Sequence, residues 1–173
     1  NEYVTKQGET TIICRTCYHK ATGKKSRVEK VWSDYLDEHV GTNFLLGSDR
    51  SLRGLGGCSL KRPDKIYASA GVVEIDECDE HQHRGDNGSY KCDEARLSEL
   101  YDDPSIVGKK LVVIRWNPHS YNVPPGKVKQ NFEERLSLMV QLKLWLRKNP
   151  PSSIISVFYI CYDLDHIRLV QNY

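Results

Sequence analysis

The feature that constrains the fold most is a nearly continuous apolar run, Leu111-Val112-Val113-Ile114-Arg115-Trp116. A short run of this kind is typical of a strand that is buried on both faces. Such strands lie inside sheets that are covered by helices. We therefore expect an α/β (α+β) domain in which residues 111–116 form a central strand.

The other expected elements follow from apolar spacing and from turn residues. Helical spacing predicts helices over residues 26–40, 90–101 and 131–148. Strand patterns cover residues 10–13, 44–46, 65–68, 72–76, 154–162 and 167–170. The short Ser69-Ala70-Gly71 connection indicates that the third and fourth of these strands form a hairpin. From residue 26 the predicted order is helix, three strands, helix, strand, helix, strand.

Length and composition limit the classes of protein that fit. The 173 residues suit one ordinary domain, and 39% hydrophobic with 28% charged residues indicates a soluble globular chain. No apolar run approaches the roughly 20 residues that cross a bilayer, and the N-terminus lacks a signal-peptide pattern. We therefore expect an intracellular protein with no membrane partner, either nuclear or cytoplasmic. Because the net charge is only +2, nucleic-acid binding would depend on local basic clusters.

The candidate catalytic residues lie on the predicted hairpin. Arg62-Pro63-Asp64 precedes its first strand, and Glu74 and Asp76 lie on its second. Alternation along a strand places Glu74 and Asp76 on one face, and we expect Asp64 to join them in one metal-facing row. Carboxylates in this number suit Mg²⁺ or Mn²⁺ in phosphodiester hydrolysis.

Acidic and histidine residues continue from position 76 to position 83. Taken alone, a charged run of this kind is usually a solvated loop, but its combination with Arg62-Pro63-Asp64 favours a metal site. Within the run, Glu77 and Asp79 alternate with the predicted metal-facing row. They either point away from the metal or reach it from the loop.

The element order and the acidic residues resemble the PD-(D/E)XK nuclease superfamily over residues 26–116. Pro63-Asp64 matches the first half of its motif, and Glu74-Ile75-Asp76 matches the second, with Asp76 where lysine usually stands. The histidine-bearing variants, very-short-patch repair and EDxHD homing endonucleases, look more similar. The resemblance implies a restriction-endonuclease-like core and a divalent-metal-dependent endonuclease that acts on DNA. It also implies that His81 or His83 acts as general base or donates a hydrogen bond to the phosphate.

Four further residues are candidate nucleic-acid contacts: Arg62, Arg96, Arg115 and Asn117. Arg96 would clamp the scissile phosphate or pair with an acid. Arg115 and Asn117 follow the central strand and would contact backbone phosphates, with Trp116 as a stacking surface. A packed Trp and a turn-forming Asn-Pro explain the same residues.

Cys14-x-x-Cys17, followed by His19, has the spacing of a zinc knuckle. His19, Cys58 or residues outside this sequence are the candidates to complete the four Zn²⁺ ligands. We therefore expect residues 1–25 to form a zinc-knuckle-like segment and residues 26–173 to form the catalytic domain. A second candidate zinc set, Cys78, His81, His83 and Cys92, would compete with a catalytic role for the histidines.

Two other functions remain open from the sequence. A catalytically inactive nucleic-acid-binding zinc module on the same scaffold would bind without turnover. A redox or purely structural zinc protein would depend on Cys14 and Cys17 and not on Asp64.

Overall fold

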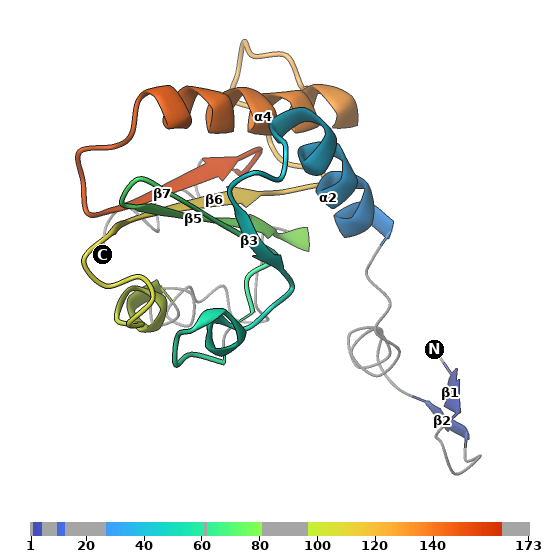
Figure 1. The fold of residues 1–173 in the computed structure, drawn as a ribbon. Helices are drawn as coiled ribbons and strands as arrows, with labels where there is room; N and C mark the ends of the chain where they lie inside the picture. The colour runs from blue at the N-terminus through green and yellow to red at the C-terminus, as the bar shows by residue number, and fades with distance from the viewer. Residues whose placement is uncertain (1, 5–9, 13–26, 61, 81–96, 164–173) are drawn as a thin grey trace.

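A five-stranded mixed β-sheet flanked by helices forms the centre of the computed structural model (Figure 1). The structure describes residues 2–4, 10–12, 27–60, 62–80 and 97–163. The sheet order is β3 (Leu45–Ser48), β4 (Lys65–Ser69), β5 (Val72–Cys78), β6 (Lys110–Trp116) and β7 (Ile155–Ile160). The first three strands are antiparallel, whereas β5, β6 and β7 are parallel. The apolar run is the interior strand β6, as its composition predicts.

The predicted hairpin is formed by β4 and β5, with Ser69 paired with Val72. Its two connecting residues, Ala70 and Gly71, both have positive φ, at 29° and 82°. Two-residue turns of this handedness match the twist of antiparallel strands, and glycine adopts them without strain. The turn therefore sets the register of the acidic strand β5 against β4.

Two helices cover one face of the sheet (Figure 1). In α2 (Arg27–Val40), Trp32, Leu36 and Val40 recur at helical spacing and are buried. The second helix, α4 (Phe132–Lys148), begins with a capping box between Asn131 and Glu134. Both helices agree with the predicted ranges.

Each face of the sheet has its own hydrophobic core. Alternate residues of β6 divide between them, so that Val112 and Ile114 face α2 and α4, and Leu111 and Val113 face away. The second core is closed by the short helix η1 (Leu52–Leu55) and by residues 97–106. With helices or turns on both faces, side chains at the middle of the sheet are buried whichever way they point.

A separate two-stranded ribbon pairs β1 (Glu2–Val4) with β2 (Thr10–Ile12). The zinc-knuckle motif, the start of the predicted 90–101 helix and the predicted 167–170 strand lie outside the described residues. Among the helices that are described, none is long and apolar enough to cross a membrane.

Candidate functional site

Acidic residues gather where β4 begins and β5 ends. The carboxylate of Asp64, directly before β4, accepts a hydrogen bond of 2.7 Å from the backbone N–H of Cys78. Lys65 pairs with Asp76, so the same register continued by one residue brings Asp64 opposite Glu77. On the other side of β5, the register of β5 and β6 places Glu77 beside Arg115. Strand β6 ends at the same edge of the sheet as β5. We call Asp64, Glu77 and Asp79 the acidic edge.

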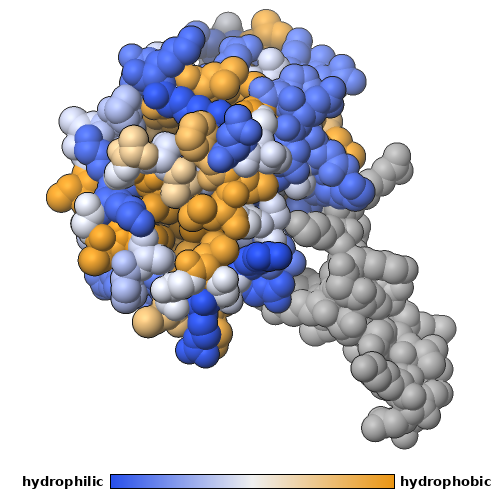
Figure 2. Space-filling model, in the orientation of Figure 1, coloured by the Kyte–Doolittle hydropathy of each residue, from blue (hydrophilic) through white to orange (hydrophobic). Residues whose placement is uncertain are grey.

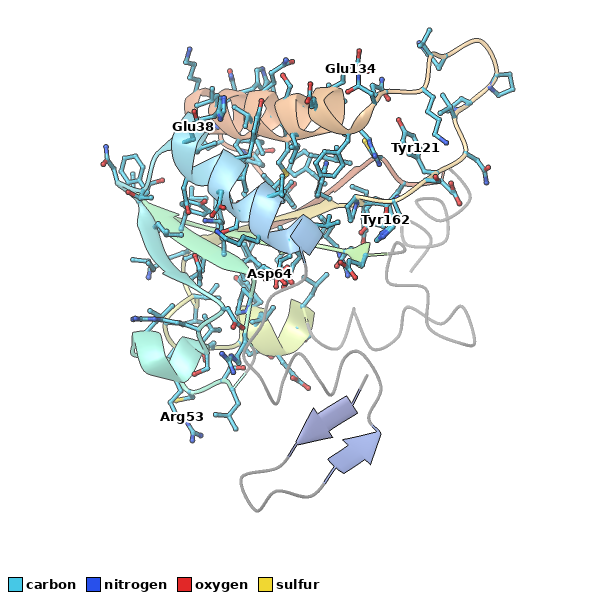
Figure 3. All side chains as sticks on the ribbon, turned by 90° about the vertical axis from the view of Figure 1, so that its right-hand side faces the viewer. Glu38, Arg53, Asp64, Tyr121, Glu134 and Tyr162 are labelled. Atoms are coloured by element: carbon cyan, nitrogen blue, oxygen red, sulfur yellow. The ribbon has the colours of Figure 1, made fainter. Side chains whose placement is uncertain are left out.

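Asp79 holds the side chain of Arg115 in place at the acidic edge. Its carboxylate oxygen Oδ2 accepts hydrogen bonds from Arg115 Nε and from the Tyr162 hydroxyl, and Asp79 is only 1% exposed. The backbone N–H of Asp79 donates to the carbonyl of Trp116 at 2.8 Å. Burial, together with the Asp79 charge, raises the pKa of Tyr162, so its hydroxyl stays a donor. Figure 3 shows Asp64 and Tyr162 relative to the sheet.

Glu74 and Asp76 share one face of β5, as predicted, but that face lies beneath α2 and α4. The ammonium of Lys143, from α4, donates to Glu74 Oε1 and to Asp76 Oδ2. Lys143 and Asp76 are fully buried, and the Lys143 nitrogen lies 3.9 Å from the centre of the Tyr67 ring. We call Lys143, Glu74, Asp76 and Tyr67 the lysine cluster.

The lysine cluster contains Glu74 and Asp76 but not Asp64, the third predicted metal ligand. Alternation along the strands puts Asp64 with Glu77 and puts Asp76 with Lys65, so Asp64, Glu74 and Asp76 do not form the single row expected from the sequence. Burial raises the pKa of Asp76 to about 7, against the opposing effect of Lys143. The Lys143 ammonium therefore takes the place that a cation would have between these two carboxylates.

The predicted nucleic-acid contacts have different environments. Arg62 is exposed, and its Nη2 donates to the Asp49 carbonyl at 2.8 Å. Arg115 is buried against Asp79. Asn117 is fully buried and bonds three backbone groups: the carbonyls of Cys161 and His119 and the N–H of His119. These bonds make Asn117 an organiser of the loop after β6.

Several candidate residues fall where the structure gives no description: Cys14, Cys17, His19, His81, His83 and Arg96. Cys58 is described and exposed, and its backbone N–H donates to the Asp103 carboxylate at 2.9 Å. Within the described ranges, no three His, Cys, Asp or Glu side chains come together to hold a metal ion.

Sequence reasoning missed the role of Lys143. Lys143 carries a detectable signal, because it falls at helical spacing between Met139 and Leu146, on the buried stripe of α4. A lysine on such a stripe indicates a buried partner of opposite charge.

Comparisons of the chain with protein-family models, with curated proteins and with solved structures found no match.

Proposed function

We propose that this protein is a divalent-metal-dependent endonuclease that hydrolyses phosphodiester bonds in DNA, with its hydrolytic site at the acidic edge. The observation that carries the proposal is the position of Asp64, directly before β4, where the register of β4 and β5, continued by one residue, brings it opposite Glu77. The order of α2, the antiparallel strands β3, β4 and β5, and the parallel strand β6 supports it. The resemblance to PD-(D/E)XK nucleases implies a helix, three strands, a second helix and a further strand, and the described elements are compatible with this order.

In this proposal Asp64 and Glu77 hold the metal ion. Mg²⁺ is commonly bound by one or two carboxylates, with waters and substrate phosphate as the other ligands, so two acids fit it. Bound Mg²⁺ would polarise the phosphoryl oxygen and lower the pKa of a water. The Cys78 N–H orients the Asp64 carboxylate at 2.7 Å.

Arg115 adds positive charge beside the metal ligands, because it is the β6 neighbour of Glu77. Asp79 and Tyr162 hold its guanidinium group in one orientation. We assign Arg115 to the stabilisation of charge that develops on the phosphate. His81 and His83 follow the acidic edge in the sequence and are proposed as general base or phosphate donor.

Glu74 and Asp76 have no hydrolytic role in this proposal. Lys143 bonds both carboxylates in the buried core, and a metal ion there would have to displace a buried ammonium. Removal of one partner from a buried ion pair is costly, which favours a structural role.

The test is cleavage of labelled single-stranded and duplex DNA with Mg²⁺ or Mn²⁺. Asp64→Asn and Glu77→Gln should each lower the rate at least about 100-fold, because each removes a metal ligand. Asp34→Asn, which changes an exposed carboxylate on α2, is the matched control and should cut normally. Equal cutting by Asp64→Asn, or no cutting by the wild type on any substrate, would contradict the proposal.

The second candidate is a nucleic-acid-binding module without hydrolysis. It is favoured by the finding that the described acids and histidines do not assemble a three-ligand centre. Its signature would be binding that weakens steeply with salt and persists unchanged when the divalent cation is removed.

A further inference from the structure

A pocket of about 120 Å³ lies at the other end of the hairpin from the acidic edge. It is lined by the turn and ends of β4 and β5, by β6, and by the C-terminal part of α4. Along β5, Glu74, which lines the pocket, is three residues from Glu77 of the acidic edge, about 10 Å at about 3.3 Å per residue. Figure 2 shows apolar surface gathered in the middle of the face below α4 and beside α2. We call this site the hairpin pocket.

Two hydrogen-bond donors at the hairpin pocket have no partner among the described residues. They are the Tyr67 hydroxyl and Nη2 of Arg147, both buried. The other terminal nitrogen of Arg147, Nη1, donates to the Val40 carbonyl at 3.0 Å. Burial, and then the charge of Asp76, raises the pKa of Tyr67, which keeps its hydroxyl protonated. Buried donors without acceptors are rare in native proteins and call for a ligand or ordered solvent.

One acceptor faces the same pocket. Glu74 lines it, and Lys143 bonds only its Oε1, so Oε2 has no bond to any residue that the structure describes. The Glu74 side chain, which carries this oxygen, is 11% exposed and lines the pocket. The polar part of the pocket therefore offers two donors and one acceptor.

The remaining walls suit one flat ring. Val72, Val112, Leu146 and two prolines give an apolar lining. The volume is close to that of an engineered 150 Å³ cavity that binds benzene, so a six-membered ring fits. At the rim, Phe44 is 45% exposed, and the Arg147 guanidinium lies 5.4 Å from its ring centre. Both groups can stack on an aromatic ligand.

We propose that the hairpin pocket binds a pyrimidine nucleobase. Cytosine carries two neighbouring acceptors, ring N3 and exocyclic O2, and one amino donor. Uracil carries the exocyclic acceptors O4 and O2, with the N3–H donor between them. Each base thus has two acceptors and one donor, the numbers that match the Tyr67 hydroxyl, Arg147 Nη2 and Glu74 Oε2. Because the order of these groups differs between the two bases, a fixed site favours one of them. The base would come from a free nucleoside or from an unpaired position in a nucleic-acid strand. The site is separate from the acidic edge and does not depend on hydrolysis.

Binding is tested by isothermal titration and amide chemical shifts, with cytidine, uridine, adenosine and a short oligopyrimidine as probes. Tyr67→Phe should weaken pyrimidine binding about fivefold to tenfold, the effect of one hydrogen bond. The substitution should leave folding intact, because the hydroxyl has no partner within the described structure. Arg147→Lys should also weaken binding. The matched control is Tyr35→Phe, since Tyr35 lies on α2 and does not line the pocket.

Saturable binding of cytidine or uridine that Tyr67→Phe weakens would support a free-nucleoside site. The same result with the oligopyrimidine alone would support recognition within a strand. The proposal would be overturned if neither the pyrimidine nucleosides nor the oligopyrimidine bound saturably. Equal binding of adenosine, or unchanged affinity in Tyr67→Phe, would also overturn it. Asp64→Asn should retain this binding, so a failure of the hydrolytic proposal is distinguishable from a failure here.

Discussion

Replacement of Lys143 by methionine tests the buried lysine cluster. The Lys143 ammonium bonds both Glu74 and Asp76 and is fully buried, so its loss leaves two carboxylates in the core without their cation. Methionine preserves most of the side-chain length, which limits the contribution of an empty cavity. Removal of one partner from a buried pair typically costs about 3–5 kcal/mol. We therefore expect Lys143→Met to lose about 3–5 kcal/mol of unfolding free energy at pH 8.

The unfolding free energy that Lys143→Met loses should be larger at pH 8 than at pH 5. The pKa of Asp76 is raised to about 7 in the folded protein from an ordinary 3.8. The folded state thus holds this proton while the unfolded state has released it, so stability falls as pH rises from about 4 to about 7. At pH 5 Asp76 is protonated, and Lys143→Met leaves only Glu74 uncompensated. The deficit should therefore be smaller at pH 5 than at pH 8.

Urea denaturation followed by tryptophan fluorescence is a suitable assay, because Trp32 and Trp116 are buried and stacked at 6.5 Å. Lys148→Met, at an exposed position of α4, is the matched control and should change stability by less than about 0.5 kcal/mol. Addition of Asp76→Asn to Lys143→Met should restore part of the loss. A loss below about 1 kcal/mol for Lys143→Met at pH 8, or one that is larger at pH 5, would show that the Lys143 ammonium does not stabilise the buried carboxylates.

Three other substitutions test local structure by urea denaturation. Asn117→Ala should cost about 3 kcal/mol, because it removes three buried hydrogen bonds to backbone groups; wild-type stability would contradict this role. Gly57→Ala should cost about 2 kcal/mol, because a Cβ there would lie 2.2 Å from Asp103 Oδ1; an unchanged midpoint would show that Asp103 can move. Asp103→Asn should reduce the amount of unfolding free energy that the protein loses between pH 4 and pH 2. Although burial opposes it, hydrogen bonds from Ser105, Ser59 and Cys58 lower the Asp103 pKa to about 2, so the stabilisation present above pH 4 disappears toward pH 2.

Local sequence signals predicted most of the described fold. Helices α2 and α4, the β4–β5 hairpin and the interior strand β6 follow from apolar spacing, glycine turns and a continuous apolar run. These signals act over neighbouring residues, so they do not require knowledge of the tertiary contacts. The 3-10 helix η1 was not predicted, since its glycine-rich sequence carries no helical pattern.

The arrangement of the candidate site was less predictable. Alternation correctly placed Glu74 and Asp76 on one face of β5, but it does not say whether helices cover that face. Covering by α4 brings in Lys143, which is 67 residues from Asp76 in the sequence. A contact over this sequence separation cannot be derived from local patterns. The position of Asp64 opposite Glu77 follows from the two-residue turn at Ala70 and Gly71, whereas the sequence prediction also put Ser69 in the connection.

The position of a bound Mn²⁺ ion shows directly whether the acidic edge is the metal site. Crystals of the wild-type protein soaked in Mn²⁺ would locate the ion by its anomalous scattering. We expect a peak at the acidic edge, bonded to the carboxylates of Asp64 and Glu77, and we expect Asp64→Asn crystals to lack it. A peak between Glu74 and Asp76, or one that Asp64→Asn leaves in place, would show that the acidic edge is not the metal site.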